Sequence, residues 1–218
     1  IHFNGNIKLI NKINIKNIKK INEKILLNNR FWIAASTHAE EEMFCLKVHS
    51  KLKKKYKDII TIIAPRHIHR ALTIKTLSEK FKFNVQLLNK GDLILRNKEI
   101  VIINSFGVLQ EYFKYAKSVF IGKSMIKKLR NDGGQNPIEA AKLKCKIYHG
   151  PYVSNFSEIY EILEKNNISK PIDTYDELSN NLIKDLDFPL KKNDDSLNVM
   201  DSLGQKTLSD TITNINNF

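Results

Sequence analysis

Short apolar runs alternate with longer amphipathic segments along most of the chain from residue 31 onward. Because several runs are apolar on successive rather than alternate residues, they predict strands buried on both faces, as in a parallel sheet covered by helices. The expected strands are Phe31 to Ala35, Ile59 to Ala64, Val85 to Leu88, Ile100 to Ile103, Val119 to Ile121 and Lys146 to Tyr148. The pattern therefore predicts a Rossmann-like, doubly wound α/β fold of about six parallel strands with helices on both faces.

Between these strands, apolar residues recur at helical spacing, which predicts helices packed on the sheet. The expected helices span 38–56, 68–82, 107–116, 136–144, 155–166 and 175–186. The same pattern divides the chain into a leading segment over 1–30, one domain over 31–190, and a linker with a weakly helical tail over 191–218. We expect that tail either to dock elsewhere or to remain loose.

A formal net charge of +13 suggests nucleic-acid binding, because clustered cations neutralise phosphates. However, Lys, Asn and Ile are abundant together, as is typical of an AT-rich genome, and no aromatic-rich strand, helix-turn-helix pattern or zinc motif accompanies the charge. We interpret the two lysine runs as solvated faces, with an anion-binding surface as the alternative, and expect no nucleic-acid partner. The runs comprise Lys8, Lys12, Lys16, Lys19, Lys20 and Lys24, and then Lys51, Lys53, Lys54, Lys55 and Lys57.

The two cysteines, Cys45 and Cys145, lack metal-type spacing, so we expect neither a disulfide nor a zinc site, and a reducing compartment. No apolar run approaches the roughly 20 residues of a membrane-spanning helix, so any membrane contact is expected to be peripheral. The chain begins with Ile and shows no signal-peptide pattern before its first strand, which predicts a fragment whose upstream part is missing.

Loops that follow strands are the expected place for function, because parallel sheets bind ligands beyond the carboxyl ends of their strands. The most specific loop holds Gly133 and Gly134 before a helix start in which Asn136 suits the N-cap, Pro137 the first turn, and Glu139 the capping-box position. A helix start explains the last three residues without any ligand. The two glycines favour a phosphate, since they let backbone amides approach an anion closely.

Two further loops offer polar groups at strand ends. Ser36 and Thr37 follow the first strand, and Thr37 has capping-box spacing to Glu40. Acids in that first turn would repel a phosphate, so we expect the Ser36 and Thr37 hydroxyls or backbone amides to meet the ligand. Arg66 follows the second strand and can clamp a phosphate or carboxylate bidentately, although a surface ion pair explains it equally well.

A fourth loop places Gly122, Lys123 and Ser124 at the end of the fifth expected strand. It supplies a glycine, a cation and a hydroxyl. Four anion-suited loops on one edge of one sheet are harder to ascribe to chance than any single one, so together they predict an anion-binding site there.

These loops resemble, in order along the chain, the motifs of the 3-deoxy-D-manno-octulosonic acid (Kdo) transferases of lipopolysaccharide assembly. The resemblance is collinear from about residue 4 to 187, and it rests on Gly5 to Lys8, Ala35 to His38 with Glu41 and Glu42, Pro65 to His67 with Arg70, Ile121 to Ser124, Gly133 to Ala141, and Gly150 and Pro151 with Asn155, Phe156, Glu158 and Ile159. Three positions depart from the family motifs. Lys123 replaces a glycine, Gln135 replaces a histidine, and Val108 stands where the family has glutamate.

The resemblance implies a two-domain GT-B glycosyltransferase whose first domain carries the catalytic carboxylate and the lipid A acceptor site. This chain would then be the second domain, a nucleotide-sugar-binding domain for CMP-Kdo, with no catalytic residue of its own, no metal and no cofactor. The donor-facing residues implied are Ser36, Thr37, Arg66, Gly122, Lys123, Ser124, Gly133, Gly134, Asn136 and Glu139. Glu139 is best suited to accept hydrogen bonds from ribose hydroxyls.

The resemblance also implies work at the cytoplasmic face of the bacterial inner membrane, where an anionic lipid surface and a lipid A precursor are the partners. The alternative within the same fold is another sugar-nucleotide enzyme, either a glycosyltransferase or an epimerase that uses a UDP-sugar.

Overall fold

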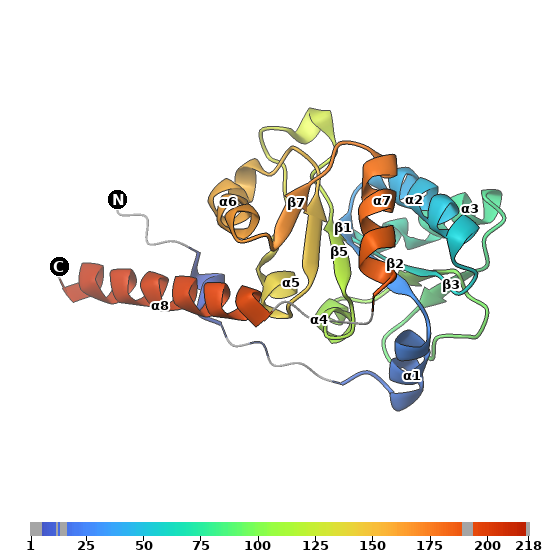
Figure 1. Cartoon of the computed structure of the whole chain (residues 1–218), viewed down its shortest axis with the longest axis horizontal. Helices are drawn as coiled ribbons and strands as arrows, with labels where there is room; N and C mark the ends of the chain where they lie inside the picture. Colours follow the sequence, from blue (N-terminus) through green and yellow to red (C-terminus); the bar gives the residue numbers. More distant parts are fainter. Residues whose placement is uncertain (1–5, 12, 14–16, 189–193, 217–218) are drawn as a thin grey trace.

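The computed structural model describes residues 6–11, 13, 17–188 and 194–216, which build one seven-stranded sheet in the order β3-β4-β2-β1-β5-β6-β7 (Figure 1). Every neighbouring pair of strands is parallel. The strands are β1 (Phe31–Thr37), β2 (Ile60–Pro65), β3 (Val85–Leu88), β4 (Ile100–Ile103), β5 (Ser118–Ile121), β6 (Lys146–His149) and β7 (Ser169–Pro171).

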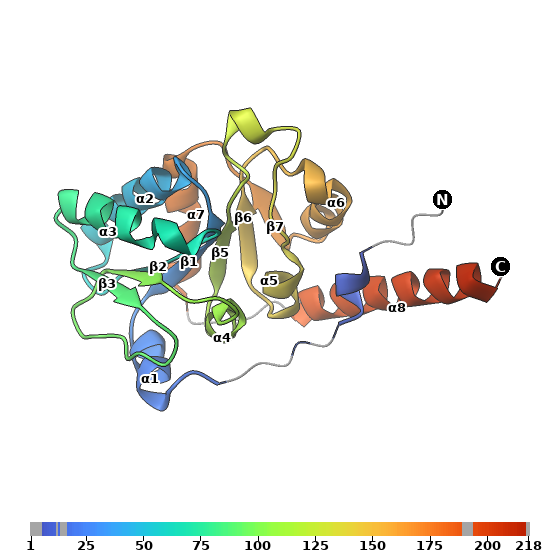
Figure 2. The same cartoon turned by 180° about the vertical axis from the view of Figure 1, so that it is seen from behind.

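Helices cover both faces of the sheet, which confirms the doubly wound α/β fold (Figures 1 and 2). Side chains of β1 alternate between two buried clusters, Ile33 toward one face and Trp32 toward the other. The Trp32 cluster contains residues of α2 (Glu41–Lys55), α3 (Ala71–Lys80) and α7 (Tyr175–Leu186). The Ile33 cluster contains residues of α1 (Lys20–Asn28), α4 (Leu109–Phe113), α5 (Ile138–Lys142), α6 (Ser157–Lys165) and α8 (Asp194–Asn216). Short 3-10 turns lie at Ile7–Leu9, Ile68–Arg70, Lys127–Leu129 and Ser154–Phe156.

Two elements were not expected from the sequence pattern. β7 adds a seventh strand at the edge of the sheet, where only Ser169 of its three residues is buried, so it has no apolar run. α1 lies within the segment over 1–30 that the pattern indicated as a leading link; its buried residues are Asn22 and Leu26, and Asn22 bonds to the backbone of Asp92 and Ile94.

The C-terminal tail is a 23-residue helix, α8, whose first turns dock on the domain. The Ser196 hydroxyl donates to the Ala141 carbonyl at 3.1 Å, and Met200 is fully buried. A Cβ added at Gly204 would lie 2.7 Å from the Leu9 carbonyl oxygen, so the helix and the N-terminal segment are in contact there. Beyond this point α8 projects away from the sheet (Figure 2). Residues 191–193 of the expected linker lie outside the described residues.

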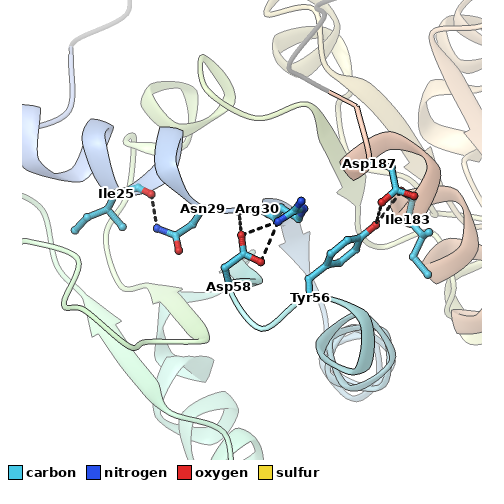
Figure 3. A network of polar contacts seen from close by, with 7 residues as sticks. All are labelled: Ile25, Asn29, Arg30, Tyr56, Asp58, Ile183 and Asp187. Atoms are coloured by element: carbon cyan, nitrogen blue, oxygen red, sulfur yellow. Dashed lines mark hydrogen bonds and ion pairs between the residues drawn. The ribbon is translucent and has the colours of Figure 1, made fainter.

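Polar contacts at the amino end of the sheet join three segments that are distant in sequence (Figure 3). Arg30, just before β1, donates to both carboxylate oxygens of Asp58 at 3.2 and 3.0 Å. The Arg30 guanidinium also lies 4.8 Å from the centre of the Tyr56 ring. The Tyr56 hydroxyl donates at 2.5 Å to the carboxylate of Asp187, the residue that follows α7. These contacts hold the start of β1, the α2–β2 turn and the end of α7 together.

Both cysteines are buried and free. Three lysines of the second run pair with acids of other elements, so part of that charge is balanced within the fold: Lys51 with Asp176, Lys53 with Glu99, and Lys55 with Asp187. Among the described helices, none combines the length and the apolar character needed to cross a bilayer.

Candidate functional site

The sheet has a switch point between β1 and β5. From β1 the chain runs to β2 and then to β3 at the edge of the sheet, β4 inserts between β3 and β2, and the chain then returns to place β5 on the other side of β1. Crevices at such switch points, beyond the carboxyl ends of the strands, are where open α/β sheets bind ligands. The loops after β1 and β5 therefore flank the expected site.

These two loops are in close contact through Gly122. A Cβ at this position would lie 2.6 Å from the Ser36 carbonyl oxygen and 2.8 Å from the Thr37 Cα, so the contact tolerates no side chain. Ser36 has a φ of 55°, and the register of β1 against β2 shifts at this residue. The bulge turns the end of β1 toward the β5 loop and explains why a glycine is required at position 122.

Glu41 fastens the two loops together. One carboxylate oxygen accepts from the Lys123 and His38 backbone amides at 2.8 and 3.0 Å, and the other accepts from the Ser124 and Met125 amides at 2.9 and 3.0 Å. Glu41 is 1% exposed, and burial raises the pKa of its carboxyl against the opposing effect of these four donors. The amides of the β5 loop are thus occupied by a side chain of the protein itself.

This arrangement corrects one expectation from the sequence. The predicted capping box between Thr37 and Glu40 is wrong, because Thr37 is the last residue of β1 and α2 begins at Glu41, with no side-chain cap at Glu40. The four amide hydrogen bonds mark Glu41 as a structural residue. Its signal in the sequence was an acid four positions after the end of a strand, and its partners lie more than 80 positions away, apart from His38.

The Ser124 side chain is also hydrogen-bonded within the fold. Its hydroxyl donates to the Ile121 carbonyl at 2.7 Å and accepts from the Gly150 amide at 2.8 Å. Ser124 and Thr37 are both 0% exposed, whereas Ser36 is partly exposed. Of the three hydroxyls predicted to face a ligand, Ser36 alone reaches the surface in this arrangement.

Lys123 connects the β5 loop to the loop that starts α5. Its carbonyl accepts from the Gly134 amide at 2.6 Å, and its ammonium lies 2.7 Å from an Asp132 carboxylate oxygen. This ammonium lowers the pKa of Asp132, with a second contribution from Asn155, which donates to the same carboxylate at 2.8 Å. Lys123 has a φ of 57°, the left-handed region in which glycine is favoured.

Arg66 extends this edge of the sheet on the β2 side. Its amide donates to the Thr37 carbonyl at 2.9 Å, which places it beside the end of β1. The Arg66 side chain is exposed, and among the described residues it has no ion-pair partner. The nearby Arg70 instead makes a bidentate pair with the buried Glu42, at 2.9 and 3.0 Å. Arg70 is thus held in a structural ion pair, whereas Arg66 has no ion-pair partner among the described residues.

The helix start at α5 agrees with the sequence only in part: α5 begins at Ile138, Pro137 rather than Asn136 directly precedes it, and within the described residues Glu139 makes no capping-box bond. The Asn136 side-chain oxygen accepts from the Ile138 amide at 3.0 Å, as an N-cap residue does, and α5 ends at Lys142. Glu139 is partly exposed in the first turn, and no bond to its carboxylate is found in the described chain. Gly133 and Gly134 lie against the backbone of Tyr152 and Val153. Their amides, which were expected to approach a phosphate, are instead bonded within the fold, to the Ser154 hydroxyl at 3.1 Å and to the Lys123 carbonyl at 2.6 Å.

Three histidines line the β1 and β2 side of this edge. The rings of His38 and His67 are 5.6 Å apart in an edge-to-face arrangement, and those of His67 and His69 are stacked at 5.6 Å. Burial lowers the pKa of His38, with His67 and Lys123 adding to the effect and the Ser36 carbonyl opposing it. Within the described residues, no group of three His, Cys, Asp or Glu side chains is placed to hold a metal ion.

Similarity to known proteins decides the family. No protein-family profile matches the chain. A 3-deoxy-D-manno-octulosonic acid transferase of Haemophilus influenzae is 31% identical over 166 residues, which cover 75% of this chain. That of Rickettsia prowazekii is 31% identical over 180 residues, or 82% of this chain. The chain belongs to the sequence family of the Kdo transferases. It spans about two fifths of these relatives, 38% of each.

Solved structures agree on the fold. The C-terminal CMP-Kdo binding domain of WaaA from Acinetobacter baumannii superimposes with a TM-score of 0.70 at 20% identity, covering 87% of this chain and 94% of that domain. A UDP-N-acetylglucosamine 2-epimerase described as putative, from Listeria monocytogenes, has a TM-score of 0.52 at 13% identity, covering 93% of this chain and 48% of that protein. This member of the Kdo transferase family therefore shares the fold of that C-terminal domain.

Proposed function

We propose that this chain is the donor-binding domain of a Kdo transferase, and that it binds CMP-Kdo at the carboxyl edge of its sheet. One observation carries the proposal: the motifs that match the family in sequence meet in space at the β1/β5 switch point. Ser36 touches Gly122, Lys123 bonds to Gly134, and Arg66 bonds to Thr37. Loops spread over nearly 100 residues of sequence, from Ser36 to Gly134, thus form one continuous rim.

The cations of this rim are the proposed ligands of the donor's phosphate and carboxylate. Arg66 is exposed and unpaired in the described chain, so its planar fork is free to take an anion bidentately. Lys123 is oriented by Asp132 and Asn155, which keeps the ammonium at the rim instead of in bulk solvent. The β5-loop amides are bonded to Glu41, so side chains rather than that nest of amides are expected to hold the phosphate.

The nucleoside is assigned to the start of α5. Glu139 presents a carboxylate with no partner in the described chain, in the first turn of a helix capped by Asn136. Carboxylate oxygens accept two hydrogen bonds readily and suit the vicinal hydroxyls of a ribose. Gly134 connects this helix start to the rim, because its amide donates to the Lys123 carbonyl.

The reaction proposed for the whole enzyme is transfer of Kdo to a lipid A precursor with inversion. An acceptor hydroxyl attacks the anomeric carbon as the bond to the CMP phosphate oxygen breaks, and the proton goes to a carboxylate outside this chain. The role of this domain is then to stabilise the negative charge that develops on the departing phosphate through Arg66 and Lys123. We place the enzyme at the cytoplasmic face of the inner membrane, because its acceptor is a lipid.

Calorimetric titration of the 218-residue chain with CMP, CMP-Kdo and UDP tests the assignment. CMP and CMP-Kdo are expected to bind and UDP to bind at least about tenfold more weakly, a difference of about 1.4 kcal/mol. No sugar transfer is expected from the chain alone. Preference for UDP would instead support a UDP-sugar glycosyltransferase or epimerase, and turnover by the chain itself would contradict the assignment of the catalytic carboxylate to another domain.

A matched pair of variants then tests the nucleoside subsite. Glu139→Gln keeps one acceptor oxygen and is expected to weaken CMP binding by about 1 to 2 kcal/mol. Glu158→Gln, an equal change at an exposed position in the first turn of α6, is expected to leave CMP affinity unchanged. Equal losses in both variants would show a general charge effect and remove Glu139 from the site.

A further inference from the structure

A cationic loop rises beyond the donor edge, between β5 and α5, and none of the proposed donor residues belongs to it. We call residues 126–131 the cationic loop; its 3-10 turn, Lys127–Leu129, stands at the top of the molecule in Figure 1. The loop borders a hollow of about 580 Å³ that is lined by Glu40, Ile126, Lys127, Lys128, Arg130 and Asn131. Glu40 immediately precedes α2, so this hollow adjoins the β1/β5 switch point.

The loop is anchored at both ends. Ile126 is 8% exposed and roots the first end in the domain, while the amides of Leu129, Arg130 and Asp132 close successive turns onto carbonyls three positions earlier. At the far end, Asp132 is held by the Lys123 ammonium and the Asn155 amide. Lys127, Lys128 and Arg130 therefore lie on a turn that backbone hydrogen bonds hold in place.

The charges around the hollow do not balance. Lys127, Lys128 and Arg130 are exposed, and among the described residues none of the three has an ion-pair partner. Glu40 is the acid that lines the hollow with them, so three cations face one carboxylate. This contrasts with the second lysine run, in which Lys51, Lys53 and Lys55 are each paired with an acid. Excess positive charge is thus concentrated at this hollow.

We propose that the hollow is a second anion site, which binds a phosphate monoester on the acceptor. The inference rests on the proposed function, because it requires a phosphorylated acceptor beside the donor edge. A monoester carries close to two negative charges near pH 7 and three acceptor oxygens, whereas the phosphate of a CMP-sugar is a diester with one charge. Two ammoniums and one guanidinium match the monoester better. The residues of the hollow then add a determinant of acceptor specificity to the acceptor site that the resemblance implies for the first domain.

The test uses the 218-residue chain, labelled with ¹⁵N and saturated with CMP-Kdo, whose diester phosphate fills the donor position without offering a monoester to the hollow. The probe is glucosamine 1-phosphate, with glucosamine as the control that lacks the phosphate, in a buffer free of phosphate. We expect the probe to shift the backbone amides of the cationic loop and glucosamine to leave them unmoved. In the triple variant K127Q/K128Q/R130Q, probe affinity is expected to fall about tenfold or more, as the loss of charge-assisted hydrogen bonds implies.

Two controls separate a site from general electrostatics. The triple variant K54Q/K57Q/R96Q removes the same kinds of charge from exposed positions away from this hollow, and it is expected to change probe affinity by less than about twofold. Glu40→Gln removes the opposing carboxylate and is expected to tighten probe binding by about twofold to threefold. Equal losses in both triple variants, or amide shifts outside the loop, would overturn the proposal.

A vesicle-binding experiment distinguishes a phosphate on the acceptor from the phosphates of a membrane surface. If the loop variant loses binding to phosphatidylglycerol vesicles while its affinity for glucosamine 1-phosphate is unchanged, the loop contacts a membrane surface, and the monoester site is overturned. CMP affinity is measured on every variant. If the loop variant binds CMP and its affinity for the probe is unaltered, the result contradicts the second site alone. If the parent chain binds no CMP, the result contradicts the proposed function.

Discussion

Replacing Glu41 with glutamine is the most demanding test of how the donor edge is held together. The two carboxylate oxygens of Glu41 each accept two backbone N–H groups, one pair from His38 and Lys123 and the other from Ser124 and Met125. Glutamine has a single acceptor oxygen. Its NH₂ group would point its own N–H bonds at one pair of N–H donors, in a place where Glu41 is 1% exposed.

The size of the effect follows from that geometry. Two buried N–H groups lose their acceptor, at about 1 to 3 kcal/mol each. Burial raises the pKa of Glu41, so the ionised carboxylate carries a desolvation cost that the neutral amide does not, and this offsets part of the loss. We therefore expect Glu41→Gln to lower the free energy of unfolding by about 2 to 4 kcal/mol.

Urea unfolding followed by circular dichroism measures this change, with Glu40→Gln as the matched control. Glu40 is the adjacent exposed residue, and its substitution is expected to alter stability by less than about 0.5 kcal/mol. CMP affinity is expected to fall in Glu41→Gln, since the β1 and β5 loops lose their common anchor. A stability within about 0.5 kcal/mol of the parent would refute the reasoning and show that the four amides find other partners.

Three further predictions concern other parts of the molecule. Arg66→Lys keeps the charge but not the bidentate geometry, so calorimetric CMP affinity should fall by about 1 kcal/mol and turnover of the full-length enzyme should fall further; unchanged values for both would make Arg66 a surface residue. Burial lowers the pKa of His49 and of His149 to about 4, so both contribute stability that is present above about pH 6.5 and is lost as pH falls toward 4. Near pH 5 the pair should add about 2.5 kcal/mol per pH unit to the slope of unfolding free energy, and His49→Gln should halve that contribution; an unchanged slope would count against the assignment. In Gly204→Ala the new methyl group would lie 2.7 Å from the Leu9 carbonyl oxygen, so limited proteolysis should cut the N-terminal segment faster, and an unchanged rate would contradict the contact.

The fold was largely predictable because its strands are buried on both faces. β3 and β4 have the bounds expected from their apolar runs, and β1, β2, β5 and β6 differ by one or two residues at their ends. A strand buried on both faces is mostly apolar, so the pattern reports it directly, even where it also buries a polar residue such as Thr61 in β2 or Ser118 in β5. β7 escaped because two of its three residues are exposed, and its place at the edge of the sheet depends on β6 rather than on its own hydrophobicity.

The candidate site was predictable only as a set of loops. The sequence indicated which strands end in glycines, hydroxyls and cations, and the rule for parallel sheets placed them on one edge. It did not indicate which of those groups the protein uses for itself. Ser124 and Thr37 carry hydroxyls as Ser36 does, yet both are fully buried, and Arg70 is an arginine near a strand end as Arg66 is, yet it is paired with Glu42.

The sequence by itself determined the buried strands of the α/β fold, the helix that starts after Asn136 and the order of the family motifs, because each is recognised from residues that are neighbours along the chain. Only the tertiary structure decided the role of Glu41, whose amide partners lie 82 to 84 positions away on the β5 loop, apart from His38. Hydrophobic periodicity reports whether a residue is buried, and carries no information about the partner that burial will bring to it. In the sequence, a carboxylate that repels a phosphate cannot be distinguished from one that holds two loops together. The difference is visible only in the folded sheet.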